Sequence, residues 1–323
     1  MTALDIRPDL VTPVEADPNS APASVDWSAE RTVAPAPPTP GRLVLLGVVW
    51  VVVAFVSMML VLYGLEPIFQ ERTQSQLLSS YRLKIERAAN ETGGLGGVTV
   101  PTLAPELGSA VAIIEIGKLQ IQQVVVEGAQ SSQTQAGPGH VPGTAGPGQP
   151  GNAAIVGRRG TFGAPFRNLD KLEPDDPIVV TTTQGQAVYR VASVSQQRID
   201  TSDARAELLG STSEDRLTLV TSAEVNPRNG DLATVVVAKL SGLPFPPTPQ
   251  GGRTDSQTGH AGDAAAWPPF VLALAGFALA AAAAVVLYRR SSVRIAYLLT
   301  TPPLIAFVIL AAESFSRFFP AWM

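Results

Sequence analysis

The sequence predicts a mainly β domain, a closed or nearly closed barrel, held at a membrane by one N-terminal and two C-terminal transmembrane helices. Two observations predict this fold class. Seven or so short runs rich in Ile and Val follow one another with little helix between them, which is typical of a barrel. Three longer apolar runs carry no charged residue, and each is long enough to span a bilayer as a helix.

The composition excludes several classes of chemistry. The chain has 323 residues, enough for one or two domains, with 46% apolar and 15% charged residues and a net charge of −4. This balance gives no reason to expect nucleic acid as a partner. The absence of cysteine excludes disulfides, thiolate nucleophiles and Cys-ligated metals. The two histidines, His140 and His260, show no metal-binding spacing, so no metal or cofactor is predicted.

The first part of the chain predicts a tail and a membrane helix. Residues 1–42 are rich in Pro, Ala, Asp and Glu without a hydrophobic period, so we expect a disordered tail; binding of a partner is an alternative role. The apolar run starts too late for a signal peptide. Residues 43–65 predict transmembrane helix 1, with Trp50 inside it and Tyr63 near its outer end. A buried helix of a soluble core is the alternative.

Residues 66–108 predict a juxtamembrane helix and a linker. Within residues 70–90, apolar side chains recur on one helical face, so this helix is expected to pack on the following domain or on a second copy. The glycine-rich run at 93–97 is expected to end the helix. The residues of the apolar face are Leu77, Leu78, Tyr81, Ile85 and Ala88.

Residues 109–242 predict the β-barrel domain. Gln184–Gly185 predicts the hairpin turn between two of its strands, and residues 200–210 predict a short helix. The segment 128–150 is rich in turn-forming residues. The predicted strands are 111–116, 119–126, 153–156, 178–183, 187–194, 217–221 and 232–240.

Residues 243–263 predict a Pro/Gly-rich linker, followed by transmembrane helix 2 (264–288) and transmembrane helix 3 (295–313). The short loop between these helices carries three arginines, a positive-inside signal. We therefore expect a multi-pass cell-membrane protein with a cytoplasmic N-terminus and an extracytoplasmic barrel. Pro302–Pro303 interrupts helix 3, as a kinked span or a re-entrant loop. The loop arginines are Arg289, Arg290 and Arg294.

Three spaced motifs carry a resemblance to a known family. They are GPGHVPGTAGPGQPGN (137–152), GNAAIVGRRGTFGAPFRNLDKL (151–172) and RLTLVTSAE (216–224). In this order they resemble the sortases, and in particular the actinobacterial class E type, over residues 109–240. Sortases are membrane-anchored cysteine transpeptidases of Gram-positive bacteria built on a β-barrel, so the resemblance implies this fold and location.

The resemblance fails at the positions where sortase chemistry takes place. The family uses a Cys nucleophile, a His acid–base group and an Arg that stabilises the oxyanion. Here Arg158 stands at the His position and Ser222 at the Cys position, while Arg228 or Asp231 stands near the Arg position. A guanidinium stays protonated and cannot act as a base, and a serine needs a base to become a nucleophile. No catalytic residue is therefore expected.

This pattern favours a catalytically inactive pseudosortase with a binding or assembly role at the outer face of the cell membrane. The expected partner is a peptide, a surface protein, an envelope polymer or another membrane protein, and a homo-oligomer is an option. The alternative is a transpeptidase or hydrolase of altered chemistry, with Ser222 as nucleophile and His140 as its base. A third hypothesis is an assembly protein that acts through its transmembrane hairpin.

A groove on the barrel is predicted to bind the partner. The adjacent arginines of the second motif would give this groove a basic floor suited to a carboxylate or a phosphate. Alternatively, these arginines pair with Glu224 or Asp231 and have no further role. The candidate groove residues are His140, Arg158, Arg159, Ser222 and Arg228.

Overall fold

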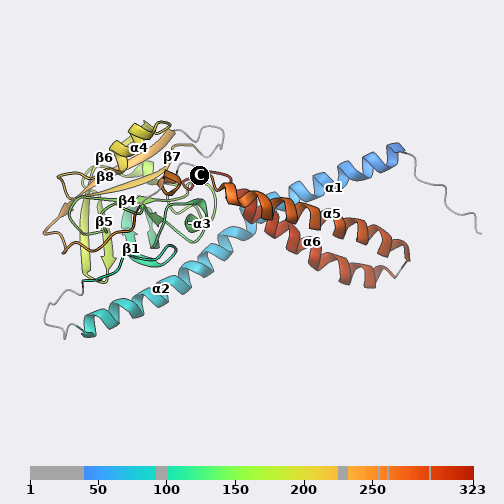
Figure 1. Ribbon diagram of the computed structural model, residues 1–323, viewed down its shortest axis with the longest axis horizontal. Helices are drawn as coiled ribbons and strands as arrows, with labels where there is room; N and C mark the ends of the chain where they lie inside the picture. Colours follow the sequence, from blue (N-terminus) through green and yellow to red (C-terminus); the bar gives the residue numbers. More distant parts are fainter. Residues whose placement is uncertain (1–39, 92–99, 225–231, 253–254, 260–261, 291) are drawn as a thin grey trace, which may run out of the picture. The chain divides into compact units, whose positions relative to one another are not determined.

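The computed structural model describes residues 40–91, 100–224, 232–252, 255–259, 262–290 and 292–323. Eight strands close a barrel in the order β1-β2-β3-β4-β7-β8-β6-β5, with helices before and after it along the chain (Figure 1). The predicted fold class is therefore confirmed. The strands are β1 (Ala110–Ile116), β2 (Ile121–Glu127), β3 (Gly139–His140), β4 (Asn152–Val156), β5 (Pro177–Thr182), β6 (Gly185–Arg198), β7 (Arg216–Ser222) and β8 (Leu232–Ser241).

Three local differences from the sequence prediction have physical causes. β2 begins two residues later than predicted, because Gln120 adopts a left-handed φ of 56° at the end of a single 3-10 turn. The hairpin turn lies at 183–184, because Thr182 already pairs with Gly185. β3 falls within the segment predicted as turns, since a strand of two residues leaves no periodic pattern in a sequence.

The helices before the barrel follow one another without a break. They are α1 (Pro40–Leu60), the π-helical turn η1 (Val61–Leu65) and α2 (Glu66–Glu91). Pro67, the second residue after η1, has no N–H for the carbonyl four residues back, a situation in which helices widen or bend. The helix that was predicted to begin at residue 70 therefore continues from the apolar run.

α2 packs against the barrel through the apolar face that the sequence predicts. Leu77, Leu78, Tyr81 and Ile85 contact a cluster that includes Val124 of β2. The Gln74 side chain donates to the Val124 carbonyl at 3.2 Å and accepts from its N–H at 2.7 Å. Of the two predicted alternatives, packing on the following domain is therefore the one seen for α2. The predicted helix end at 93–97 lies outside the described residues.

The two helices after the barrel are α5 (Trp267–Arg290) and α6 (Val293–Ser316). They pack side by side as a hairpin (Figure 1). Arg317 after α6 forms an ion pair with Asp263 before α5, which ties the two barrel-side ends together. α6 continues as one helix through its two internal prolines, without the break that a re-entrant loop would need. The basic loop lies at the other end of the hairpin, about 36 Å away along a helix of 24 residues.

Among the described residues, three helical stretches are long and apolar enough to cross a membrane by length and composition: Val48–Asn90, Ala264–Arg290 and Arg294–Ser316. They coincide with the predicted spans, although the first also includes the polar helix α2. One lies before the barrel and two lie after it, as the fold-class prediction requires.

The central strands β4 and β7 separate two apolar cores. The strands are parallel neighbours, and β4 is buried along its whole length. Leu217 and Leu219 of β7 face the barrel interior, whereas Val220 faces a second cluster on the outside. α4 (Ser202–Leu209), the short helix predicted at 200–210, covers part of this outer cluster, and residues 321–323 cover another part. The site described below lies where these two strands end.

Candidate functional site

The parallel pairing of β4 and β7 brings two of the sequence motifs to one edge of the barrel. Val156 pairs with Val220, so the residues after β4 lie beside the end of β7. The Gly157 N–H donates to the Val220 carbonyl at 3.0 Å. The Arg159 guanidinium donates to the Ser222 carbonyl at 3.1 Å. The structure therefore brings together the predicted positions Arg158, Arg159 and Ser222.

Arg158 is 1% exposed, although it carries a full charge. Burial, its main influence, lowers the pKa of the guanidinium to about 10, while the Glu66 carboxylate acts in the opposite direction. The group therefore remains cationic at neutral pH and cannot accept a proton. Its plane also lies over the ring of Phe162, with 4.7 Å between Cζ and the ring centroid.

Uncharged oxygens surround the Arg158 guanidinium. Nε donates to the Thr134 hydroxyl at 3.2 Å, and Nη1 donates to the Thr161 hydroxyl at 3.0 Å. Nη2 donates to the Ser131 carbonyl at 2.9 Å and to its hydroxyl at 2.7 Å. Among the described residues, no carboxylate forms an ion pair with Arg158. The fork-shaped donor set thus organises the loops around it and leaves little capacity for an external anion.

Arg159 behaves differently from its neighbour. Its guanidinium pairs with Asp170 at 3.3 Å and is partly exposed. An anionic partner group would have to compete with this carboxylate. The predicted basic floor therefore consists of one buried cation bonded to uncharged oxygens and one partly exposed cation paired with a carboxylate.

The Ser222 side chain is fully buried and is used locally. Its Oγ donates to the Glu224 carbonyl at 2.6 Å and accepts from the Glu224 N–H at 3.3 Å. Within the described part of the chain, no imidazole or carboxylate lies within hydrogen-bond distance of this hydroxyl. A nucleophilic serine needs such a base, and the described residues do not place one beside this hydroxyl.

His140 lies away from Ser222, on the far side of β4. Ile155 pairs with His140 on one side and with Leu219 on the other, which separates the histidine from β7 by about 10 Å, two strand spacings. Ser222 lies three residues further along β7. The structure does not bring these two residues together as a base and a nucleophile.

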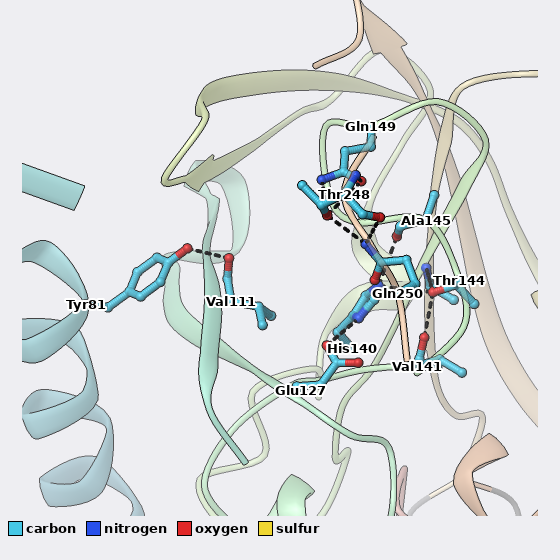
Figure 2. Close-up of polar contacts among 11 residues, drawn as sticks. Tyr81, Val111, Glu127, His140, Val141, Thr144, Ala145, Gln149, Thr248 and Gln250 are labelled. Atoms are coloured by element: carbon cyan, nitrogen blue, oxygen red, sulfur yellow. Dashed lines mark hydrogen bonds and ion pairs between the residues drawn. The ribbon is translucent and has the colours of Figure 1, made fainter. Parts of the chain in front are cut away.

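His140 instead belongs to a buried polar cluster (Figure 2). Its Nδ1 lies 2.7 Å from Glu127 Oε2, and its Nε2 lies 2.9 Å from the Ala145 carbonyl and 3.1 Å from the Thr144 hydroxyl. Burial opposes protonation, but the hydrogen bond and the charge of Glu127 outweigh it and raise the pKa of His140. Through its hydrogen bonds to Thr144 and Ala145, the imidazole holds the turn-rich segment that follows β3 in place.

The sequence interpretation missed two parts of this region. Glu127 ends β2 and reaches His140 through the parallel pairing of β2 with β3, which no local pattern signals. Residues 318–323 return to the barrel after α6, and Trp322 among them is only 1% exposed. An aromatic residue close to Pro320 does not by itself predict a segment that packs on the barrel. Arg228 and Asp231, the candidates near the family Arg position, lie outside the described residues.

Gly157 provides a direct test of how tightly this edge is packed. A Cβ at this position would lie 2.3 Å from the Phe166 ring, so Gly157→Ala is expected to lower the free energy of unfolding by roughly 1–3 kcal/mol. The matched control is Gly117→Ala, because a Cβ there meets nothing within 4 Å. Chemical denaturation of the full chain in detergent micelles, followed by tryptophan fluorescence, measures both. Equal stability of the two variants would contradict this packing.

The barrel matches a family model described as the Sortase domain over residues 114–241. This part of the chain is therefore similar to sortase domains. Sortase SrtE1 of Streptomyces coelicolor is 38% identical to it over 96 residues, which are 28% of this chain and 27% of that protein. Sortase D of Bacillus subtilis is 30% identical over 87 residues, which are 27% of this chain and 42% of that protein. The chain thus spans less than half of the length of either relative.

Solved structures of sortases are also similar to this chain. A Sortase D5 transpeptidase of Clostridium perfringens gives a TM-score of 0.42 at 26% identity, covering 53% of this chain and 99% of that one. Sortase E1 of Streptomyces coelicolor, determined with a tripeptide in its active site, gives a TM-score of 0.37 at 27% identity, covering 47% and 99% of the respective chains.

Proposed function

We propose that this protein is a membrane-anchored pseudosortase of a Gram-positive, actinobacterial cell envelope. Its sortase domain has lost transpeptidase chemistry and serves in binding or assembly at the outer face of the membrane. One observation carries the proposal. Where the barrel edge would need a proton acceptor and a nucleophile, it has a buried guanidinium bonded to Ser131, Thr134 and Thr161, and a hydroxyl whose hydrogen bonds within the described residues go to the Glu224 backbone.

The proposed orientation rests on charge. The loop between α5 and α6 is basic, and positively charged loops stay in the cytoplasm. The barrel-side ends of the hairpin then lie at the outer face, where a peptide, a surface protein, an envelope polymer or another membrane protein would be the partner. In a second version of this proposal, the protein assembles with its partner through the hairpin of α5 and α6, and the barrel itself binds no partner.

The alternative function is a transpeptidase or hydrolase that uses Ser222 as nucleophile. Within the residues that the structure describes, no contact of the Ser222 hydroxyl favours it over the proposal, because the hydrogen bonds of this hydroxyl go to backbone atoms of Glu224. The two functions nevertheless differ in one direct chemical outcome, the formation of an acyl–serine ester.

Mass spectrometry of the full chain in detergent micelles separates these functions. The chain is incubated with a pool of sorting-signal-like peptides and an amine acceptor, and a Ser222→Ala variant is treated in parallel. We expect intact protein, intact peptides and no difference between the two chains. An ester on Ser222, or an amide product that is lost in Ser222→Ala, would overturn the proposal and identify a serine enzyme.

A further inference from the structure

Residues 318–323, here called the return segment, lie on the edge of the barrel where the candidate site was found. The segment follows α6, and three of its residues, Ala321, Trp322 and Met323, join the outer apolar cluster of β4 and β7. The Ala321 N–H donates to the Gly259 carbonyl at 2.9 Å. The segment belongs to none of the barrel strands, so it is an addition to the sheet rather than a member of it.

The Trp322 carbonyl occupies a slot lined by donors from the end of β7 and from the loop that follows β4. The backbone N–H groups of Ser222 and Arg159 each donate to this oxygen at 3.2 Å. The Thr221 hydroxyl lies 3.4 Å from the same oxygen. Two converging N–H groups bind a main-chain carbonyl whatever side chain its residue carries. This slot therefore recognises peptide backbone.

The Trp322 side chain supplies the specificity that a backbone slot lacks. It is 1% exposed and packs in the outer cluster with residues of β4, β7 and α4. A Cβ at Gly259 would lie 3.3 Å from the indole ring, so the chain passes closely over it there. The neighbouring Ala321 is fully buried, which leaves room for only a small side chain before the aromatic one.

Arg158 forms hydrogen bonds to residues that in turn contact the return segment and the end of α6. Thr161, which accepts from Arg158, donates its hydroxyl to the Met323 carbonyl at 3.1 Å. Ser131, which also accepts from Arg158, donates to the Ser316 carbonyl at 3.3 Å, just before the segment. The arginine at the family His position is therefore connected through one hydroxyl to the last residue of the return segment and through another to the end of α6 just before the segment.

We infer that this edge is a peptide-binding slot for a small residue followed by a tryptophan, and that the return segment is its intramolecular occupant. A partner peptide then binds only by displacing residues 318–323. The inference rests on the proposed binding role of the same site. It adds that the ligand is a peptide and that this peptide competes with residues 318–323 for the slot. Tethering gives the segment an effective concentration near the millimolar range, so free peptide must be supplied at a comparable level.

The absence of cysteine from the chain makes the test simple. Ala321→Cys places a single thiol in the buried segment, and Leu243→Cys places one at a position that is 94% exposed. Both full-length chains are labelled with a maleimide in detergent micelles. We expect Ala321→Cys to react at least tenfold more slowly than Leu243→Cys. Equal rates would overturn the inference, because the segment would then not be docked. Met323→Cys provides a second reporter if Ala321→Cys does not fold.

The synthetic hexapeptide FFPAWM, with the sequence of residues 318–323, is then added in trans. We expect it to accelerate labelling of Ala321→Cys several-fold at millimolar concentration, with no effect of a scrambled peptide. Adding Thr161→Val, which removes the bond to Met323, is expected to speed labelling of Ala321→Cys in the absence of peptide about fivefold, the equivalent of one hydrogen bond. Thr212→Val, whose hydroxyl bonds to Glu214, is the matched control and should change nothing.

Labelling that stays slow at every peptide concentration in both backgrounds would overturn the inference, since the segment would then be a permanent part of the fold. This failure is distinct from failure of the proposed function. An ester on Ser222 would reject the loss of catalysis without changing the labelling rates. Peptide-insensitive labelling would reject only the displaceable occupant.

Discussion

Arg158→Leu is expected to lower the free energy of unfolding by roughly 3 kcal/mol, because it leaves buried acceptors without their donor. The guanidinium bonds to Ser131, Thr134 and Thr161. A buried ionic group can often be replaced by an apolar one at little cost, but only when its partners are replaced with it. Here the partners include the main-chain carbonyl of Ser131, which no side-chain substitution removes.

The measurement is chemical denaturation of the full chain in detergent micelles. Arg167→Leu is the matched control, since this arginine is exposed and its loss should change the stability by about 0.5 kcal/mol or less. Arg158→Lys should fall between them, because an ammonium keeps the charge but not the planar fork. A loss of less than about 1 kcal/mol in Arg158→Leu would mean that the hydroxyls find other partners.

Arg158→Leu should also release the return segment. This guanidinium bonds to the Thr161 hydroxyl, which contacts the last residue of the segment, and to the Ser131 hydroxyl, which contacts the end of α6 just before it. Combined with Ala321→Cys, the substitution is therefore expected to speed maleimide labelling about tenfold, in line with one to two hydrogen bonds. Stability and labelling thus report two separate consequences of one residue. If the stability changes but the labelling rate does not, Arg158 stabilises the barrel without holding the return segment in place.

The sequence predicted the parts of this protein whose signals are local. Runs of Ile and Val gave most of the strands, and three charge-free runs gave the helices that could cross a membrane. The resemblance assigned Arg158 and Ser222 to the family's His and Cys positions, and the parallel pairing of β4 and β7 brings these two residues to one edge of the barrel. The functional meaning of those two positions stays a proposal.

The parts that escaped prediction depend on contacts between distant residues. Ser131 and Ser316 are 185 positions apart, and Thr161 and Met323 are 162 apart, so no window of sequence contains either pair. The expectation of a basic groove had a similar weakness. Adjacent arginines carry the same charge in a sequence, but Arg158 is buried among hydroxyls whereas Arg159 pairs with Asp170. Burial, which separates their roles, is a property of the folded barrel.

His140 is expected to make the stability of the barrel fall as the pH rises above about 6.5, its ordinary pKa. Burial alone would lower the pKa of His140, but Glu127 at 2.7 Å outweighs burial and raises it. A raised folded-state pKa means that the folded chain binds the proton more tightly than the unfolded chain. The stabilisation is then complete below pH 6.5 and is lost as the pH rises through the folded-state pKa. His140→Gln should remove this dependence.

Glu127→Gln should reverse the sign of the effect. The amide keeps the shape of the carboxylate but removes the charge, so burial becomes the dominant influence and the pKa of His140 should drop below 6.5. The folded state then prefers the neutral imidazole, and this variant loses stability as the pH falls below 6.5, while above it the stability is level. Unfolding free energies of both chains between about pH 5.5 and 9 test this, with His140→Gln as the baseline. Parallel profiles in the two chains would show that the Glu127–His140 contact does not control the proton, and that the turn-rich segment after β3 is held by its backbone instead.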